Sequence, residues 1–370
     1  MKVPFVDLRK QYLSIKKEID NAISNVIDET AFIKGKYVRK FEKDFSKSYG
    51  IDHTISCGNG TDAIYIALRS LDIGLGDEVI TSAMSWISTS EVISQTGAKP
   101  VFIDVGDDYL IDCDLIERKI NKKTKAIIPV HLYGQPANMD KIMQIAKKYN
   151  LKVIEDCAQA HFSKFKGKHV GTFGDFGTFS FYPGKNLGAY GDAGALITDN
   201  EELAKKAEMF CNHGSLIKHE HKIEGINSRM DGIQAAILSV KLNFIHDWTE
   251  RRNLVASTYI KYLSTLDDKL KCPVLNPNIE HSFHLFVIKT SSNHRDNLKK
   301  WLESKGISTG IHYPKALPFL DAYSYLEHES KEFPNAFNFQ GSILSLPMYP
   351  ELTEPTVSDI CKELIQYFDE

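Results

Sequence analysis

The residues around Lys185 indicate that this lysine could be a nucleophile. The segment Gly177-Thr-Phe-Ser-Phe-Tyr-Pro-Gly-Lys185 runs from a short alternating strand, predicted over 178–181, into a Pro-Gly turn. Glycines at 188, 191 and 194 and an apolar strand follow. A lysine amine becomes a nucleophile when burial or nearby cations lower its pKa, and its usual product is a Schiff base with a carbonyl. Taken alone, the pattern fits a nucleophile and an exposed loop lysine equally well.

Asp156 favours the interpretation of Lys185 as a nucleophile. The run 152–155 follows a helical stretch and predicts a buried parallel strand that ends at Asp156. Ligand sites in open α/β sheets lie at that edge. A carboxylate there would keep the pyridine nitrogen of pyridoxal phosphate protonated, which makes the ring an electron sink. An Asp in this position is also a common helix N-cap, so the combination with Lys185 carries the cofactor hypothesis.

A third segment, 54–68, predicts a strand, a glycine-rich turn and a helix. The first N–H groups of such a helix are free to bind an anion. Gly58-x-Gly60-x-x-Ala63 half-matches the dinucleotide fingerprint, which also needs an acidic residue at the end of the second strand. That strand ends in Thr81-Ser82-Ala83. The turn therefore predicts a cradle for a single phosphate, with Thr61 and Ser180 as hydroxyl donors.

In this order, the three segments resemble the sugar aminotransferases of the DegT/DnrJ/StrS family, which are pyridoxal phosphate enzymes of fold type I. The likeness covers almost the whole chain. Its motifs are Val3-Pro-Phe-Val-Asp-Leu, Pro129-Val-His-Leu-Tyr-Gly-Gln, Glu155-Asp-Cys-Ala-Gln-Ala-His, Ser180-Phe-Tyr-Pro-Gly-Lys-Asn-Leu-Gly, Gly225-Ile-Asn-Ser-Arg-Met-Asp-Gly-Ile-Gln-Ala-Ala-Ile-Leu and Leu344-Ser-Leu-Pro-Met-Tyr-Pro. The resemblance implies an α/β fold with a mostly parallel sheet flanked by helices, and a smaller C-terminal α/β domain.

The resemblance also implies roles for cofactor-binding residues. Lys185 would be the Schiff-base lysine and the proton shuttle, Asp156 would pair with the pyridine nitrogen, and Gln159 would bind the ring hydroxyl. Trp86 matches an aromatic residue that stacks on the cofactor face, with a plain core tryptophan as the alternative. The residues expected around the phosphate are Gly60, Thr61, Asp62 and Ser180.

Asn227 matches an asparagine that reaches the phosphate of the neighbouring subunit in relatives, which implies an obligatory homodimer with shared active sites. The alternative is that Asn227 caps the following helix. Arg229 either binds the carboxylate of the amino donor or pairs with Asp231. The remaining expected substrate contacts are His161, Tyr182, His312 and Tyr313; packing is the alternative for the two histidines and for Tyr313.

Composition limits the other possibilities. The chain has 370 residues, 42% of them apolar and 25% charged, and a net charge of −3, which disfavours nucleic acid as a partner. No apolar run reaches the ~18 residues of a membrane span, and Met1-Lys-Val-Pro-Phe-Val-Asp lacks the apolar core of a signal peptide. Six cysteines without a Cys-x-x-Cys pair favour reduced thiols in the cytoplasm. His219-Glu-His221 has no third ligand at suitable spacing, so no metal site is expected.

The pattern along the chain is consistent with two domains. Helical periodicity covers 8–29, 37–49 and 231–264, and between them short apolar runs alternate with helical stretches. Such alternation predicts a largely parallel sheet with helices on both faces. A second strand and helix pattern begins after Cys272-Pro273. We predict a large cofactor-binding domain over 1–248, including the N-terminal helices, and a small domain over 249–370.

These observations predict a transaminase with two half-reactions. Glutamate would convert pyridoxal phosphate to pyridoxamine phosphate and leave as 2-oxoglutarate, and a keto sugar linked to a nucleotide would then take the amine. Relatives that are sugar dehydratases carry histidine at the lysine position. A non-catalytic sensor or scaffold of the same fold is the alternative from another class, and the intact Lys185, Asp156, Gln159 and Asn227 disfavour it. The missing ribose-binding acid disfavours an NAD-linked oxidoreductase.

The segment 181–192 also indicates which carbon is aminated. Phe-Tyr-Pro-Gly-Lys-Asn-Leu-Gly-Ala-x-Gly-Asp resembles enzymes that act at C-3, whereas many C-4 enzymes carry His-Pro before the lysine and Gly-Glu-Gly after it. The expected acceptor is a dTDP-linked 3-keto-6-deoxyhexose and the product a 3-amino-3,6-dideoxyhexose for a surface polysaccharide such as O-antigen or for a natural product. The alternatives are a 4-keto sugar and a UDP-linked 3-keto uronic acid, whose carboxylate Lys218 or Lys222 could meet.

Overall fold

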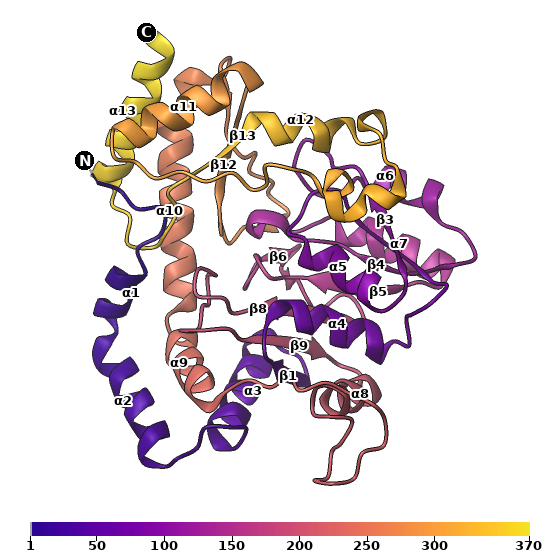
Figure 1. Cartoon of the computed structure of the whole chain (residues 1–370). Helices are drawn as coiled ribbons and strands as arrows, with labels where there is room; N and C mark the ends of the chain where they lie inside the picture. The colour runs from indigo at the N-terminus through magenta and orange to yellow at the C-terminus, as the bar shows by residue number, and fades with distance from the viewer. Residues whose placement is uncertain (1) are drawn as a thin grey trace.

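The protein, described here by a computed structural model of residues 2–370, is built around a seven-stranded sheet (Figure 1). The strands are β1 (His53–Cys57), β2 (Glu78–Ser82), β3 (Lys99–Ile103), β4 (Thr124–Ile128), β5 (Lys152–Asp156), β8 (Phe176–Ser180) and β9 (Gly194–Thr198). Their order is β1-β9-β8-β5-β4-β2-β3, and β9 alone runs against the others. The α/β fold with a mostly parallel sheet is therefore confirmed.

Apolar side chains project from both faces of this sheet, because successive residues of a strand point to opposite sides. Ile127 and Val153 pack on one side with α3 (Lys36–Tyr49), α7 (Met139–Tyr149) and α9 (Gly232–Leu242). Ile128 and Ile154 pack on the other with α4 (Gly60–Ser70), α5 (Ser88–Gln95) and α8 (Glu201–Cys211). Continuous apolar strands are typical of a sheet buried on both faces.

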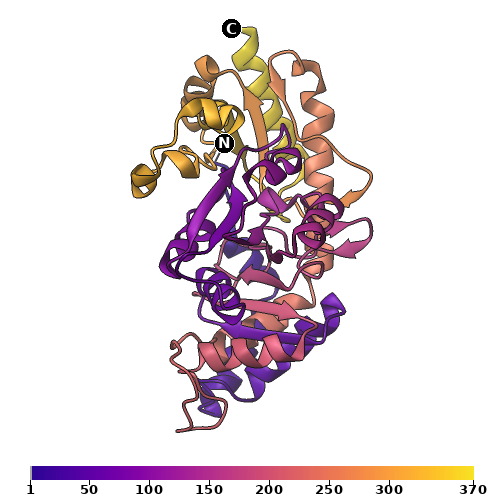
Figure 2. The same ribbon diagram turned by 90° about the vertical axis from the view of Figure 1, so that its right-hand side faces the viewer.

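The C-terminal segments form a second apolar cluster at one end of the molecule, coloured orange and yellow (Figures 1 and 2). Here α10 (Ile245–Leu263), α11 (Ser292–Ser304) and α13 (Glu354–Asp369) pack around a small sheet. That sheet contains β10 (Leu270–Lys271), β12 (Phe286–Thr290) and β13 (Ile343–Leu346), all antiparallel. The predicted boundary at 248 falls in the first turn of α10 and stays a prediction.

The helical segments are shorter than their sequence periodicity suggests. The stretch 8–29 divides into α1 (Leu8–Ser14) and α2 (Lys16–Asp28) at Ile15, where φ is −129° and the side chain is buried. The stretch 231–264 divides into α9 and α10 around residues 243–244. Apolar residues on both sides of each break keep the helical period, so periodicity alone cannot locate it. No helix within residues 2–370 combines the length and apolar character needed to cross a membrane.

Glu155 is a fully buried carboxylate that joins several segments behind β5. It accepts hydrogen bonds from the backbone N–H groups of Gly171, Phe173 and Gly174 at 2.7–2.9 Å. His131 Nδ1 accepts from the Ala137 N–H, so Nε2 carries the proton and faces Glu155 at 3.1 Å. Cys157 lies within 4.8 Å of both side chains, but the ring nitrogens and carboxylate oxygens already have hydrogen-bond partners. This cluster is therefore structural.

Substituting Glu155→Gln tests that network. The amide can present oxygen to only some of the N–H donors, and its NH2 group faces the others, so we expect a loss of about 3 kcal/mol in the free energy of unfolding. Glu280→Gln is the control, because Glu280 pairs with Lys164 at an exposed site and its loss should cost less than about 1 kcal/mol. Urea unfolding measures both variants. Equal losses would contradict a structural role for Glu155.

Candidate active site

The carboxyl ends of the central strands open into a cavity of about 600 Å³. It contains Lys185 from the loop after β8 and Asp156 from the end of β5. The other predicted site residues that line it are Gly60, Thr61, Trp86, Gln159, Ser180, Tyr182, His312 and Tyr313. Segments as far apart in the chain as Gly60 and Tyr313 thus meet at the edge of the sheet where ligands bind in open α/β folds.

Lys185 is held on a tight turn, in which its N–H donates to the carbonyl oxygen of Tyr182 at 2.8 Å. The chain then folds back so closely that a side chain at Gly188 would meet the Pro183 carbonyl oxygen at 2.3 Å. Burial lowers the pKa of the Lys185 amine to about 8, and the nearby Asp156 carboxylate opposes that shift. Within residues 2–370, the amine has no hydrogen-bond or salt-bridge partner. It is thus a lysine that can lose its proton near neutral pH.

Asp156 is oriented toward the same cavity by two donors. Its Oδ2 accepts from the Thr89 hydroxyl at 2.8 Å, and its Oδ1 accepts from the Ala158 N–H at 3.1 Å. The Thr89 hydroxyl in turn lies 2.8 Å from that of Ser85. A carboxylate fixed in this way suits an ion pair with a protonated ring nitrogen.

The N-terminus of α4 supplies an anion site at one end of the cavity. Asn59 caps the helix by accepting from the Asp62 N–H at 2.8 Å. The N–H groups of Gly60 and Thr61 have no hydrogen-bond partner within residues 2–370. A Cβ atom at Gly60 would lie 2.5 Å from that of Ser180, so only glycine allows the end of β8 to approach. Free N–H groups, a hydroxyl and a helix N-terminus together favour a phosphate.

The aromatic wall of the cavity comes from both ends of the chain. Gln159 accepts from the Tyr133 N–H at 2.8 Å and donates to the Tyr313 hydroxyl at 2.9 Å. Trp86 is 58% exposed, and its ring lies 5.8 Å from that of Tyr313. His312 stacks on Phe5, and burial lowers the pKa of its ring to about 4. The rings of Phe5, Trp86, His312 and Tyr313 therefore give the cavity an aromatic wall.

Four predicted site residues do not line the cavity. His161 is fully buried against Phe179 and Phe181, and neither of its ring nitrogens has a partner within residues 2–370. Asp62 accepts from the Ser228 hydroxyl at 2.6 Å. Asn227 and Arg229 lie on the segment after α8, and Asn227 is exposed. Arg229 forms no salt bridge with Asp231 in the described part of the chain. Their predicted roles stay predictions.

The sequence reasoning missed several residues that line the cavity. Ser85, Ser88 and Thr89 belong to a hydroxyl-rich run just after β2, and their place at a strand end was a usable signal. Asn59 carried the signal of a helix cap. Asp192 lies on the Lys185 loop, within the segment 181–192. His284 and Phe5 carried no signal, because long-range contacts bring them to the cavity.

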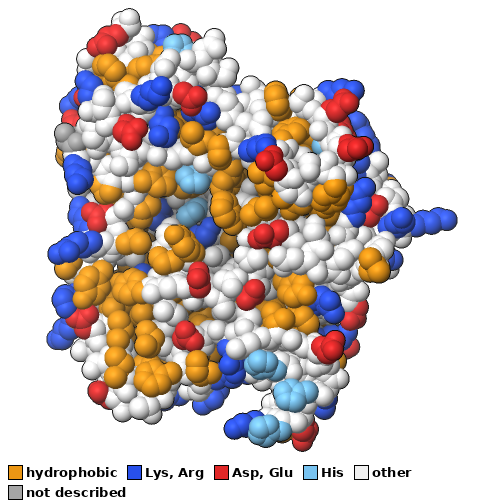
Figure 3. Space-filling view, viewed as in Figure 1, with side chains coloured by type: hydrophobic (Ala, Val, Ile, Leu, Met, Phe, Trp, Pro, Cys, Tyr) orange, Lys and Arg blue, Asp and Glu red, His pale blue; other side chains and the backbone are white. Residues whose placement is uncertain are grey.

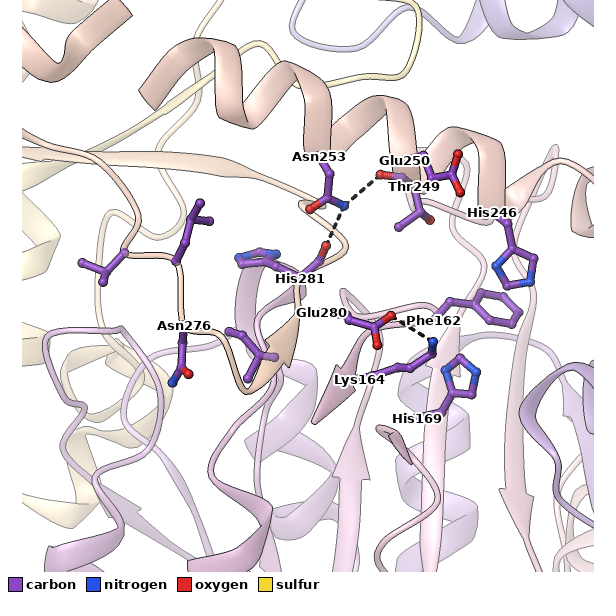
Figure 4. A pocket seen from close by; sticks show the side chains of 13 residues that line it. Phe162, Lys164, His169, His246, Thr249, Glu250, Asn253, Asn276, Glu280 and His281 are labelled. Atoms are coloured by element: carbon purple, nitrogen blue, oxygen red, sulfur yellow. Dashed lines mark hydrogen bonds and ion pairs between the residues drawn. The ribbon is translucent and has the colours of Figure 1, made fainter. Parts of the chain in front are cut away.

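A second cavity, of about 510 Å³, lies between α10 and the strands β6 (Lys164–Phe165) and β11 (Ile279–Glu280) (Figure 4). Its Lys164 is paired with Glu280 at 2.9 Å. Its Asn253 donates to the carbonyl oxygens of Thr249 and His281. The lysine of this cavity is thus already neutralised, and the cavity with Lys185 is the candidate active site.

The Lys185 cavity fits pyridoxal phosphate. An amine of lowered pKa, a fixed carboxylate, aromatic faces and an anion site surround one space. These are the groups that hold the aldehyde, the ring nitrogen, the ring face and the phosphate of that cofactor. Because Gly60 has no side chain, Ser180 can approach it closely, and the N–H groups at the start of α4 stay open to a phosphate.

Known proteins resemble this chain over almost its whole length. Residues 13–365 match the model of the DegT/DnrJ/EryC1/StrS aminotransferase family. The chain is 42% identical over 370 residues to a pleiotropic regulatory protein of Geobacillus stearothermophilus, covering 100% of this chain and 99% of the relative. It is 41% identical over 366 residues to dTDP-3-amino-3,6-dideoxy-alpha-D-galactopyranose transaminase of Aneurinibacillus thermoaerophilus, covering 99% of each.

A solved structure shows the same similarity. The crystal structure of S. venezuelae DesV in complex with a ketimine intermediate has a TM-score of 0.97 to this chain and 37% sequence identity. The match covers 100% of this chain and 99% of that chain. Together with the sheet topology, it confirms the predicted aminotransferase fold.

The titration of Lys185 tests the electrostatics of the site. In the cofactor-free protein, the yield of Lys185 modified by an amine-reactive label in short pulses should rise with pH and reach half its maximum near pH 8, because only the neutral amine reacts. Asp156→Asn removes the carboxylate that raises this pKa, so the midpoint should move to lower pH. Peptide mass spectrometry measures the yield.

Asp192→Asn is the matched control, because Asp192 lines the same cavity but is not among the charges that shift the pKa of Lys185. Its midpoint should equal that of the unaltered protein. A midpoint near pH 10.5, or the same displacement in both variants, would refute the account of Lys185.

Proposed function

The chain belongs to the DegT/DnrJ/EryC1/StrS aminotransferase family, and we propose that it transfers the amino group of glutamate to a keto sugar linked to a nucleotide, with pyridoxal phosphate as cofactor. The observation that carries this proposal is that Lys185 and Asp156 share one cavity with a free helix N-terminus. When bound, pyridoxal phosphate supplies a carbonyl that takes up amines and a ring that withdraws electrons from the reacting carbon.

The chain itself supplies proton transfer. The Lys185 amine, with a pKa of about 8, can take a proton from the reacting carbon and return it near neutral pH. His161, His284 and His312 surround it, and burial lowers the pKa of all three rings. Since the three rings stay neutral, Lys185 is the proton carrier of the cavity.

The rival functions fit the site less well. A relative carries the name of a regulatory protein, but a sensor has no use for a desolvated lysine opposite a fixed carboxylate. A dehydratase of this family would carry histidine in place of Lys185. An NAD-linked enzyme would need an acid where β2 ends, and the chain has Thr81 and Ser82 there.

The proposed acceptor is a dTDP-linked 3-keto-6-deoxyhexose. The residues 181–192 support amination at C-3, as does the similarity to a dTDP-3-amino-3,6-dideoxy-alpha-D-galactopyranose transaminase. Tyr182 and Trp86, both exposed at the cavity, are suited to contact the sugar. A UDP-linked 3-keto uronic acid is the second candidate, because Lys218 and Lys222 on the exposed loop could meet its carboxylate.

The proposed assembly is a homodimer whose active sites are shared. Lys185 is the only cation that lines the cavity in the described chain, whereas the substrates bring a diphosphate and two carboxylates. The loop 212–228 projects away from the body, with lysine and histidine side chains on it (Figure 3). Apolar side chains are exposed beside α2, which is typical of a protein interface; they are Leu13, Ile27, Phe32 and Ile33. A partner loop would bring Asn227 as a hydrogen-bond donor, and Lys218 and Lys222 as the missing positive charge.

Turnover of a substrate panel tests the chemistry. With glutamate, we expect the dTDP-linked 3-keto-6-deoxyhexose to give a product whose amino group is at C-3 by NMR, with formation of 2-oxoglutarate. The 4-keto isomer and the UDP-linked 3-keto uronic acid should react at least tenfold less efficiently, since an unpaired polar group costs about 1.4 kcal/mol or more. Lys185→Ala should abolish turnover. Amination at C-4, or full turnover by Lys185→Ala, would contradict the proposal.

Subunit mixing tests the shared site. Lys185→Ala and Asn227→Ala chains should each be inactive or weak alone. In a mixed dimer, one site combines an intact Lys185 with an intact Asn227, so random exchange should restore about a quarter of the normal activity. The control is a chain with both substitutions mixed with Lys185→Ala, which should restore nothing. An active monomer in sedimentation, or no recovery in the first mixture, would rule out shared sites.

A further inference from the structure

His284 lines the active-site cavity next to Leu285. It lies just before β12, on a segment that packs against the Lys185 loop through the side chain of Asn186. The imidazole ring and Lys185 line the same cavity, and the ring is close enough for the charge of the lysine to act on it.

The hydrogen-bond network fixes which nitrogen of His284 carries a proton. The Asn186 side chain approaches the Ser282 carbonyl oxygen at 2.9 Å. A carbonyl oxygen only accepts, so the amide NH2 must point there and the amide oxygen must point to His284. That oxygen lies 3.2 Å from Nδ1 of His284. Nδ1 is therefore the N–H donor, and the neutral ring leaves Nε2 with a free lone pair.

The surroundings keep the ring neutral. Burial lowers the pKa of His284 well below its ordinary value, and the nearby cations Lys185 and Arg252 lower it further, as do the rings of His312 and His161. No carboxylate contributes to the shift. Nε2 has no hydrogen-bond partner within residues 2–370, and the half-buried ring lines the cavity, so this acceptor is open to a ligand.

The free lone pair of Nε2 can bind only a group that donates a hydrogen bond. It repels the carboxylates of glutamate, the diphosphate and a carbonyl oxygen, all of which only accept hydrogen bonds. The amino group of glutamate is a donor, but it is consumed at the reacting carbon in the first half-reaction. The donors that a neutral sugar offers are its hydroxyl groups. His284 and Lys185 line the same cavity, so a sugar whose carbonyl carbon reacts at Lys185 has the hydroxyl groups of the adjacent carbons on the side open to Nε2.

We infer that Nε2 of His284 accepts a hydrogen bond from the sugar hydroxyl next to the reacting carbonyl, and so makes His284 a specificity residue for hydroxylated over deoxygenated keto sugars. Asn186 acts as the positioning residue that holds the ring in the accepting tautomer. The inference rests on the proposed function and concerns only the second half-reaction.

The test compares His284→Asn with the unaltered holoenzyme. Asparagine keeps an amide where Nδ1 faces Asn186 and removes the group at Nε2. For the dTDP-linked 3-keto-6-deoxyhexose, kcat/KM should fall about tenfold, the effect of one hydrogen bond to an acceptor in the cavity. For one of its 2-deoxy and 4-deoxy analogues, the one that lacks the contacted hydroxyl, kcat/KM should be equal in both proteins.

Two further variants separate specificity from folding. His284→Gln, whose amide oxygen can reach the place of Nε2, should recover part of the discrimination. His246→Asn, at an exposed histidine of the second cavity, should change nothing. The colour change that glutamate produces in the holoenzyme should keep its rate in all variants, because the first half-reaction does not use His284.

Failure of this inference can be told apart from failure of the proposed function. An equal fall in kcat/KM for the parent sugar and both deoxy analogues would overturn the inference, as would no fall at all or a slower reaction with glutamate. Absence of any glutamate reaction in the unaltered holoenzyme would instead remove the proposed function.

Discussion

The desolvation of one amine is the constraint on which the site depends. Lys185 has to lie in a cavity, away from water and without a fixed partner, because a partnered or hydrated lysine keeps its proton at neutral pH. Burial brings its pKa to about 8, and Asp156 alone opposes the shift. The close turn at Gly188 holds the amine there. Beneath this loop, the buried Lys241 donates to the Gly188 carbonyl oxygen at 2.6 Å.

Adjacent carboxylates on β5 show how the sheet separates structure from chemistry. Side chains alternate along a strand, so Glu155 and Asp156 leave it in opposite directions. Glu155 enters a closed network of backbone N–H groups and His131. Asp156 enters the cavity, where Thr89 and Ala158 donate to it. The hydrogen bonds of Glu155 hold the end of β5 in place. Asp156 can therefore face a cofactor from a fixed position.

The sequence predicted what depends on local pattern. The ends of β1 and β5, the turn before α4 and the loop of Lys185 follow from apolar runs, glycines and capping residues that lie close together in the chain. It did not predict the helix breaks at Ile15 and after Leu242, since the apolar period continues through both. It also did not predict that His284 lines the cavity, because the contact of His284 with Asn186 spans 98 residues.

The central claim is that the site stores an amino group between two substrates. Its most direct test uses holoenzyme treated with ¹⁵N-labelled glutamate, separated from free amino acid by gel filtration, and then given the dTDP-linked 3-keto-6-deoxyhexose alone. The account predicts one ¹⁵N-labelled amino sugar per active site, and none from Lys185→Ala. Unlabelled product, or product only while glutamate is still present, would contradict it.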